Sequence, residues 1–131
     1  MQGSHFTDAL SELRLEQKLQ PRSTEVLTNI ARVQLAMGDD AGAEVALRQV
    51  ITLGDAPPQT YRLLAKTKLR TGDAPSAVTL LNRFVATSPD DSLAYYLLVR
   101  AYRTIGDHDK MNLAIESYKR TSQDESDRRL I

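Results

Sequence analysis

Apolar residues recur along the chain with the spacing of helical faces, both before and after Gly38. Leu27 and Ile30 precede this glycine by eleven and eight positions. Three further apolar residues follow it at five, nine and twelve positions: Ala43, Leu47 and Val50. Offsets of three, four and seven residues place side chains on one face of a helix. The pattern predicts two amphipathic helices joined by a tight turn at Gly38.

The glycine and its apolar neighbours return at a fixed interval. Gly38, Gly72 and Gly106 stand 34 residues apart, and an aspartate follows each of them. The corresponding positions around the second and third glycine are Tyr61, Leu64, Ala77, Leu81 and Phe84, and then Tyr95, Leu98, Met111, Ile115 and Tyr118. A fixed interval of this length indicates a stack of repeated helix pairs.

The Gly-Asp stretches carry the chemistry of turns. Glycine tolerates the left-handed conformation that ends a helix, and aspartate accepts hydrogen bonds from the free N–H groups of the next helix. Pro75 suits the first turn of a helix, where its missing N–H costs nothing. We therefore interpret the stretch "GDDAGA", from Gly38 to Ala43, as a turn rather than as an ion or phosphate site.

This pattern resembles the tetratricopeptide repeat, a 34-residue helix–turn–helix unit. The third unit matches best, through Tyr95, Leu98, Val99 and Tyr102 before Gly106. The departures are the missing tryptophan in every unit, Gln34 and Lys68 in place of tyrosine, Met111 in place of alanine, and a closing proline only at Pro89. The resemblance implies an all-α fold, a right-handed superhelical solenoid of helix–turn–helix repeats in which the first helix of each pair lines a concave groove. It also implies a role in protein–protein interaction.

The interval fixes the expected domain organisation. A helix before the first full unit and a polar segment after the last one either cap the stack or belong to a longer array. The opening "MQGSHF" resembles a remnant of an expression vector. The expected segments are 1–6 as this remnant, 7–21 as a half-repeat or capping helix, 24–57, 58–91 and 92–125 as repeats, and 126–131 as the start of a capping helix or next repeat.

Composition narrows the function classes. The 131 residues include 17 Lys and Arg against 17 Asp and Glu, so the net charge is close to zero, unlike that of a strongly basic nucleic-acid-binding protein. The chain has no cysteine, which excludes disulfides, thiolate metal sites and a cysteine nucleophile. No apolar run approaches the roughly 20 residues that cross a bilayer. Cytoplasmic and periplasmic locations remain equally open.

The charges are unevenly distributed, and this predicts a binding groove. The expected first helices hold seven basic residues and one acidic residue, Glu25. Arg32, Lys66 and Arg100 each stand six residues before a repeat glycine, so we expect a row of cations along the groove. The remaining candidate groove residues are Arg62, Arg70, Tyr96, Arg103, Leu35 and Leu69. Arginine and lysine suit carboxylates, and the groove is expected to bind an acidic or extended peptide, or a peptide's C-terminal carboxylate.

Three alternatives stay open. The cations can be solvated surface residues aligned by repeat duplication alone. The chain can be a structural module that stacks with itself or with neighbouring repeats. Its sequence resembles bacterial repeat arrays, including those attached to envelope and polysaccharide-secretion systems. It can also be the docking arm of an enzyme whose catalytic domain lies elsewhere. The clamp that binds chaperone tails is disfavoured, because only Asn29 supplies a nearby asparagine.

Other chemistry is not expected. The acidic clusters at Asp39, Asp90 and Asp107 lack the spacing of a metal site, and no motif frames a nucleophile. We expect no cofactor, no metal, no catalysis, no nucleic acid and no membrane insertion. The aromatic residues at helix-packing positions are expected in the core: Tyr61, Phe84, Tyr95, Tyr102 and Tyr118. Only Tyr96 is expected on the groove face.

Overall fold

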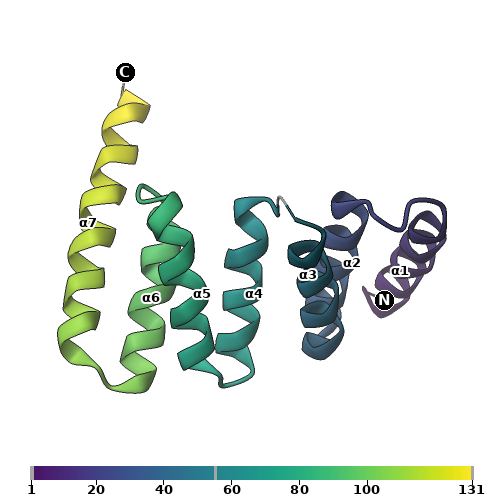
Figure 1. Ribbon diagram of the computed structural model, residues 1–131, viewed down its shortest axis with the longest axis horizontal. Helices are drawn as coiled ribbons and strands as arrows, with labels where there is room; N and C mark the ends of the chain where they lie inside the picture. Colours follow the sequence, from purple (N-terminus) through teal and green to yellow (C-terminus); the bar gives the residue numbers. More distant parts are fainter. Residues whose placement is uncertain (1, 55, 131) are drawn as a thin grey trace. The chain divides into compact units, whose positions relative to one another are not determined.

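The chain folds into α-helices joined by short turns, as the computed structural model shows (Figure 1). The structure describes the backbone of residues 2–54 and 56–130, and the side chains of residues 5–54, 56–124 and 126. Within these residues there are seven helices and no strand. The helices are α1 (Gln2–Leu19), α2 (Thr24–Met37), α3 (Asp40–Leu53), α4 (Pro58–Arg70), α5 (Ala74–Thr87), α6 (Ser92–Ile105) and α7 (His108–Leu130). The prediction of an all-α fold built from helix–turn–helix repeats is confirmed.

Two compact units divide the chain, with the boundary between Thr67 and Lys68 inside α4. In the first unit α1 packs against α2, and α2 packs against α3. In the second unit α5 packs against α6, and α6 packs against α7. Each unit therefore builds its own core from helices that follow one another along the chain.

The periodic apolar positions form these cores. In the first unit Ile30, Leu47 and Val50 are fully buried. In the second unit Leu81, Phe84 and the small residue Ala101 are buried in the same way. The buried side chains lie on the faces where α2 meets α3 and where α5 meets α6, so the helical spacing read from the sequence corresponds to real packing faces.

The Gly-Asp stretches are turns, as predicted. Gly38 has φ 85° and ψ 9°, the left-handed conformation, and Asp39 N–H donates to the carbonyl of Gln34 at 2.8 Å. The Asp39 carboxylate accepts from Gly42 N–H at 3.0 Å and caps α3. At the third turn Asp107 caps α7 by accepting from the N–H of Lys110 at 3.1 Å. The turn chemistry of the sequence is therefore used for helix termination and capping.

Asp73 caps α5 and makes this turn sensitive to acid. Hydrogen bonds from the Ser76 side chain and from Ser76 N–H hold the pKa of Asp73 below its ordinary value, and the ammonium of Lys68 lowers it further. A lowered folded pKa contributes stability above the ordinary pKa that is lost as the pH falls through the folded value. We expect Asp73→Asn to be less stable than the wild type at neutral pH and to lose less stability below about pH 4. Urea denaturation across this range measures the difference.

The two proteins should converge at low pH, where Asp73 is neutral in both the folded and the unfolded state. Asparagine is itself a good N-cap, so the comparison removes the charge and keeps a side-chain oxygen for the cap. A difference between the proteins that stays constant across the pH range would contradict this role of the charge.

Both terminal helices differ in extent from the sequence prediction. The first helix begins at Gln2, earlier than the expected Thr7. The last helix, α7, continues to Leu130 without the turn that was expected before residue 126. The earlier second helices end near Gly54 and Pro89, whereas residues 122–126 contain neither glycine nor proline. Nothing in the sequence breaks α7 over the described residues 126–130, and the assignment of 126–131 to the start of a capping helix or next repeat stays a prediction.

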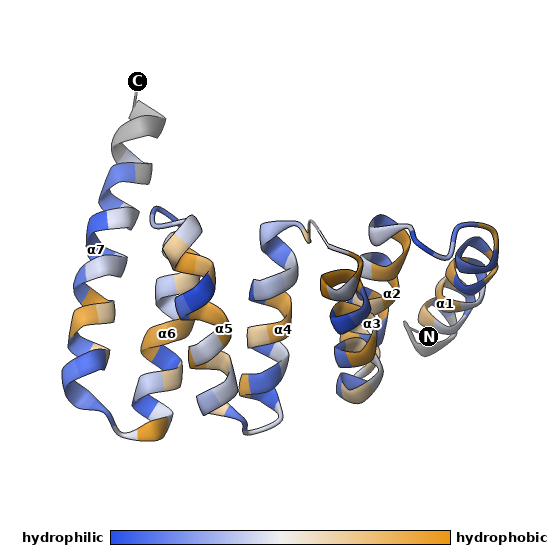
Figure 2. Cartoon of the chain, in the orientation of Figure 1, coloured by the Kyte–Doolittle hydropathy of each residue, from blue (hydrophilic) through white to orange (hydrophobic). Residues whose placement is uncertain are grey.

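Polar residues predominate along α7, whereas apolar residues form clear bands on α5 and α6 (Figure 2). None of the helices in the part of the chain that the structure describes has the length and apolar character required to cross a membrane.

Candidate functional site

The cations of the predicted row lie on α2, α4 and α6 and have no ionic partners among the residues that the structure describes. Arg32 and Lys66 are exposed, and Arg100 is partly exposed. Among the described residues, neither these three side chains nor Arg103 form an ion pair or a hydrogen bond. An unpaired surface cation keeps its full capacity to bind a carboxylate. These helices therefore present positive charge that the chain itself does not neutralise.

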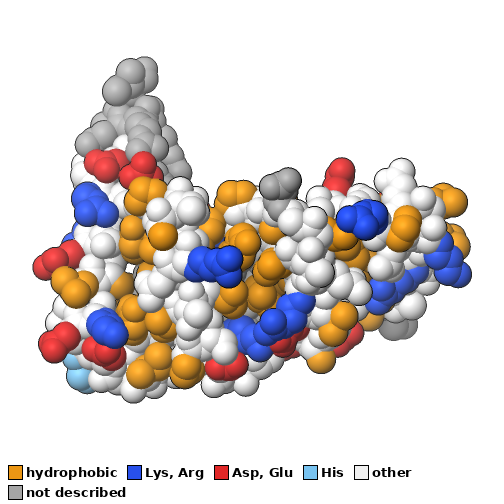
Figure 3. Space-filling view, in the orientation of Figure 1, with side chains coloured by type: hydrophobic (Ala, Val, Ile, Leu, Met, Phe, Trp, Pro, Cys, Tyr) orange, Lys and Arg blue, Asp and Glu red, His pale blue; other side chains and the backbone are white. Residues whose placement is uncertain are grey.

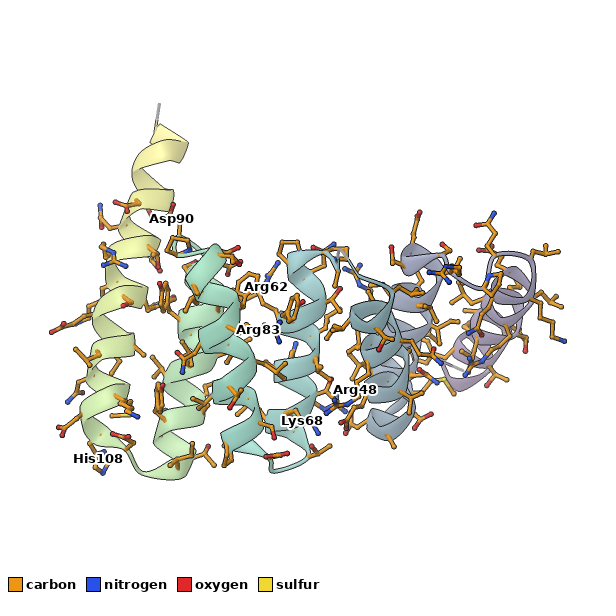
Figure 4. All side chains as sticks on the ribbon, viewed as in Figure 1. Arg48, Arg62, Lys68, Arg83, Asp90 and His108 are labelled. Atoms are coloured by element: carbon orange, nitrogen blue, oxygen red, sulfur yellow. The ribbon has the colours of Figure 1, made fainter. Side chains whose placement is uncertain are left out.

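Two basic residues of the second helices are paired, whereas Arg83 of α5 and Lys119 of α7 have no ion pair among the described residues. On α3 the Arg48 Nε lies 3.0 Å from a carboxylate oxygen of Glu44 (Figure 4). On α7 the Lys110 ammonium lies 4.0 Å from Asp107. In the space-filling view, basic side chains near the lower end of α7 accordingly stand beside acidic ones (Figure 3). Charge on the second helices is thus partly neutralised in place.

The basic residues of α4 divide into two groups. Lys68 is partly buried and pairs with Asp73 at 3.7 Å, so it supports the turn after α4 (Figure 4). Arg62 and Arg70, both predicted groove residues, already interact with other groups of the chain. Lys66 is the basic residue of α4 that remains without such a partner among the described residues. Fewer of the basic side chains on α4 are therefore available to bind a partner than the sequence of this helix indicates.

In the first unit, Arg32 lines a small polar cavity. The cavity has a volume of about 280 Å³ and lies between α2 and the start of α4. Its polar walls come from Thr24, Glu25, Thr28, Asn29, Arg32 and Gln59. The Thr28 hydroxyl donates to the Thr24 carbonyl at 2.7 Å. The Arg32, Asn29 and Gln59 side chains are among the donors that line the cavity, and Glu25 adds a carboxylate to the same wall. Amide and guanidinium groups at one opening suit the carbonyls and carboxylates of a peptide.

In the second unit, α6 carries a continuous exposed stripe. It consists of Leu93, Tyr96, Arg100 and Arg103, which follow one another at intervals of three and four residues. The apolar members stand toward the start of the helix and the cations toward its end. Tyr96, predicted to lie off the core, is 46% exposed. The stripe is therefore a surface with an apolar end and a cationic end.

Tyr118 was expected in the core and is instead 38% exposed. Its ring centroid lies 6.1 Å from that of Tyr96, with the ring planes inclined by 50°. The equivalent residue of the preceding repeat, Phe84, is only 3% exposed. Within the described chain α7 is the last helix, and no later helix covers Tyr118. Its residue type is aromatic like that of Phe84, so the residue type alone does not distinguish the two positions.

The remaining predicted site residues are only partly exposed or are divided between the two units. Leu35 and Leu69 are half-buried, so each offers only part of its side chain. Arg32 and Lys66 belong to the first unit, whereas Arg100 belongs to the second. A row of cations running through both units therefore stays a prediction.

Acidic residues serve the fold. Asp39, Asp73 and Asp107 each accept a hydrogen bond from a helix N–H. In the part of the chain open to description, no three His, Asp or Glu side chains converge as metal ligands would.

The chain is similar to tetratricopeptide repeats in sequence and to MamA structures in fold. Residues 58–101, which form α4, α5 and most of α6, match the tetratricopeptide repeat family. Comparison with curated proteins gave no match. The fold is similar to a crystal structure of MamA, with a TM-score of 0.80 and 25% sequence identity, covering 92% of this chain and 68% of that one.

Two further MamA structures agree. A MamA RS-1 ArsTM double mutant gives a TM-score of 0.84 at 22% identity, covering 92% of this chain and 67% of that one. MamA 41-end from Desulfovibrio magneticus RS-1 gives 0.83 at 22% identity, covering 88% and 66%. The chain thus spans about two thirds of the length of these structures. Its match over residues 58–101 and its three Gly-Asp turns, 34 residues apart, show a fragment built of tetratricopeptide-like repeats.

Proposed function

We propose that the chain binds an acidic, extended segment of a protein partner through the cations on its first helices. The observation that carries the proposal is the excess of basic residues on α2, α4 and α6, which together hold seven basic residues and one acidic residue, Glu25. Of these basic residues, Arg32, Lys66 and Arg100 have no ionic partner among the described residues. Because the net charge of the chain is zero, this surplus is local and selects an acidic partner.

The chemistry of binding follows from the side chains. Arginine presents a planar fork that can hold a carboxylate through two parallel hydrogen bonds, and lysine supplies a mobile point charge. Around Arg32 the Asn29 and Gln59 amides can hold the backbone of the same segment. Exposed charges are screened by salt over roughly 10 Å at 0.1 M ionic strength, so the affinity should fall as salt is added.

The test is a triple charge reversal, Arg32→Glu/Lys66→Glu/Arg100→Glu. We expect it to weaken binding of a fluorescent peptide of about ten residues, rich in glutamate and long enough to extend over roughly 33 Å, by at least about tenfold. Fluorescence anisotropy measures the affinity, and circular dichroism confirms that the variant remains helical. Affinity capture from a lysate of the source cells with both proteins would then identify the natural partner.

A matched control separates site binding from general charge attraction. Arg48→Glu/Arg83→Glu/Lys119→Glu makes the same change in net charge at exposed residues of the second helices. This control should bind the acidic peptide nearly as well as the wild type. Equal weakening by both triple variants, or no binding by the wild type, would reject the proposed site.

Exposed apolar residues favour one rival function, self-association. Leu15 and Leu19 of α1 are largely exposed, as apolar residues at a contact between repeat arrays would be in an isolated chain. Sedimentation that depends on protein concentration and is unchanged in the charge-reversed variant would support a stacking module. A further alternative is that the chain is the docking arm of an enzyme. The sequence of the full-length protein would test this by showing whether a catalytic domain is present.

A further inference from the structure

We infer that Tyr96 and Tyr118 form an aromatic anchor beside Arg100, and that the bound segment carries an apolar side chain two residues from an acidic one. This inference rests on the proposed function, because it specifies the acidic segment in the second unit. It turns a general preference for acidic peptides into a short motif with a fixed spacing.

The anchor is a pair of exposed rings that come from two helices. Tyr96 on α6 and Tyr118 on α7 have ring centroids 6.1 Å apart and planes inclined by 50°. They are 46% and 38% exposed, and Leu93, three residues before Tyr96, is exposed as well. Two tilted rings with a leucine beside them offer an apolar side chain contacts on more than one side. Aromatic rings of this kind supply much of the binding energy of protein interfaces.

Charge complementarity identifies what occupies the anchor. Arg100 lies one helical turn beyond Tyr96 on the same face of α6, and Arg103 lies three residues further on. Within the described residues, neither arginine has an ion pair. A purely apolar occupant, such as an added helix packed on α7, would leave this pair of cations unsatisfied at its border. An acidic peptide with an apolar side chain satisfies both ends of the stripe at once.

The spacing of the motif follows from backbone geometry. Tyr96 and Arg100 are four residues apart in a helix, a rise of about 6 Å. In an extended peptide, side chains two residues apart point to the same side and lie about 6.6 Å from each other. A peptide that runs along α6 therefore places an apolar side chain over the rings and an acidic one over Arg100. A second acidic residue, two positions beyond the first, comes within reach of Arg103.

The experiment compares peptides of defined sequence on the full chain. The motif peptide contains leucine, any residue, glutamate, any residue, glutamate between glycine and serine flanks. One reference peptide replaces the leucine with glycine, and a second moves the leucine next to the first glutamate. A reversed peptide, with the leucine after the glutamates, tests the direction of binding. We expect the better of the two directions to bind about tenfold more tightly than either reference peptide.

Variants then assign that difference to the rings. Tyr96→Ala/Tyr118→Ala should abolish the tenfold preference while leaving the affinity for the leucine-free peptide unchanged. Tyr96→Phe/Tyr118→Phe should retain the preference, because it keeps both rings. Leu113→Ala, at an exposed apolar residue of α7 outside the stripe, is the matched control and should also retain it.

The outcomes separate the two proposals. If all acidic peptides bind equally and the triple charge reversal weakens them, the anchor is overturned while the cationic site stands. If no acidic peptide binds the wild type, both are overturned. If the tyrosine variants abolish self-association and leave peptide binding unchanged, the rings belong to a contact between copies and the inference fails. The wild-type comparison of peptides decides the motif even if the alanine variant does not fold.

Discussion

Replacing Leu81 with alanine is expected to lower the free energy of unfolding by about 2 to 5 kcal/mol. Leu81 has 0% of its surface exposed and lies on α5, which packs against α6 in the second unit. Truncation removes the burial of its outer methyl groups and leaves a cavity that rigid neighbouring helices fill only in part. Urea denaturation followed by helical circular dichroism measures the loss.

Leu113→Ala is the control for this prediction. Leu113 lies on α7 in the same unit and is 63% exposed, so the same truncation should change the stability by no more than about 0.5 kcal/mol. Equal losses at the two leucines would mean that the core of the second unit does not lie between α5 and α6.

Enlarging Ala77 to methionine is expected to cost about 1 to 3 kcal/mol of stability. Ala77 has 0% of its surface exposed at the packed face of α5, and the equivalent Ala43 of the first unit is also fully buried. A longer side chain at this position must push neighbouring side chains out of their preferred rotamers or displace the helices. The measurement is again the free energy of unfolding in urea.

The third repeat carries methionine at this position naturally, which supplies a control. Met111 is only half-buried on α7, so the site there has room for the longer side chain. Met111→Ala should cost less than about 1 kcal/mol, because little of the side chain is removed from water. A stable Ala77→Met protein would show that the packing at Ala77 is looser than its burial indicates.

The sequence predicts the repeat and its turns because both depend on local chemistry. A left-handed glycine followed by a capping aspartate needs only neighbouring residues, and Gly38 with Asp39 adopts the expected conformation. The apolar faces are also local, since helical spacing alone decides which side of a helix can be buried. Leu47 and Leu81 are accordingly buried where their offsets place them.

Burial of residues on α7 was harder to predict, because it depends on which helices pack against them. Tyr118 occupies the same repeat position as the buried Phe84, and only the three-dimensional neighbourhood distinguishes the two. The helix α7 continues to Leu130, and residues 122–126 contain neither glycine nor proline that would end it earlier. Periodicity describes the interior of a stack better than its edges.

For the candidate site, the sequence predicted where the cations lie on the helices but not which of them form ion pairs. Lys68 and Lys66 are two residues apart and equally basic, yet Lys68 is committed to Asp73. The polar cavity at Arg32 also includes Gln59. Gln59 lies on α4, after the whole of α3, so the sequence alone does not indicate that it lies near Arg32. Whether the cations act as one row is decided by the binding experiments above.

The Gly-Asp turns have a consequence for how such a chain can evolve. At the first turn the backbone and capping hydrogen bonds join residues between Gln34 and Ala43, and the turns at Gly72 and Gly106 close through similar local bonds. A stretch of ten residues thus contains all the groups that join the two helices. A duplication or deletion of one whole repeat would leave the remaining joints intact, so new lengths of array can arise in one genetic step without compensating substitutions at the joints.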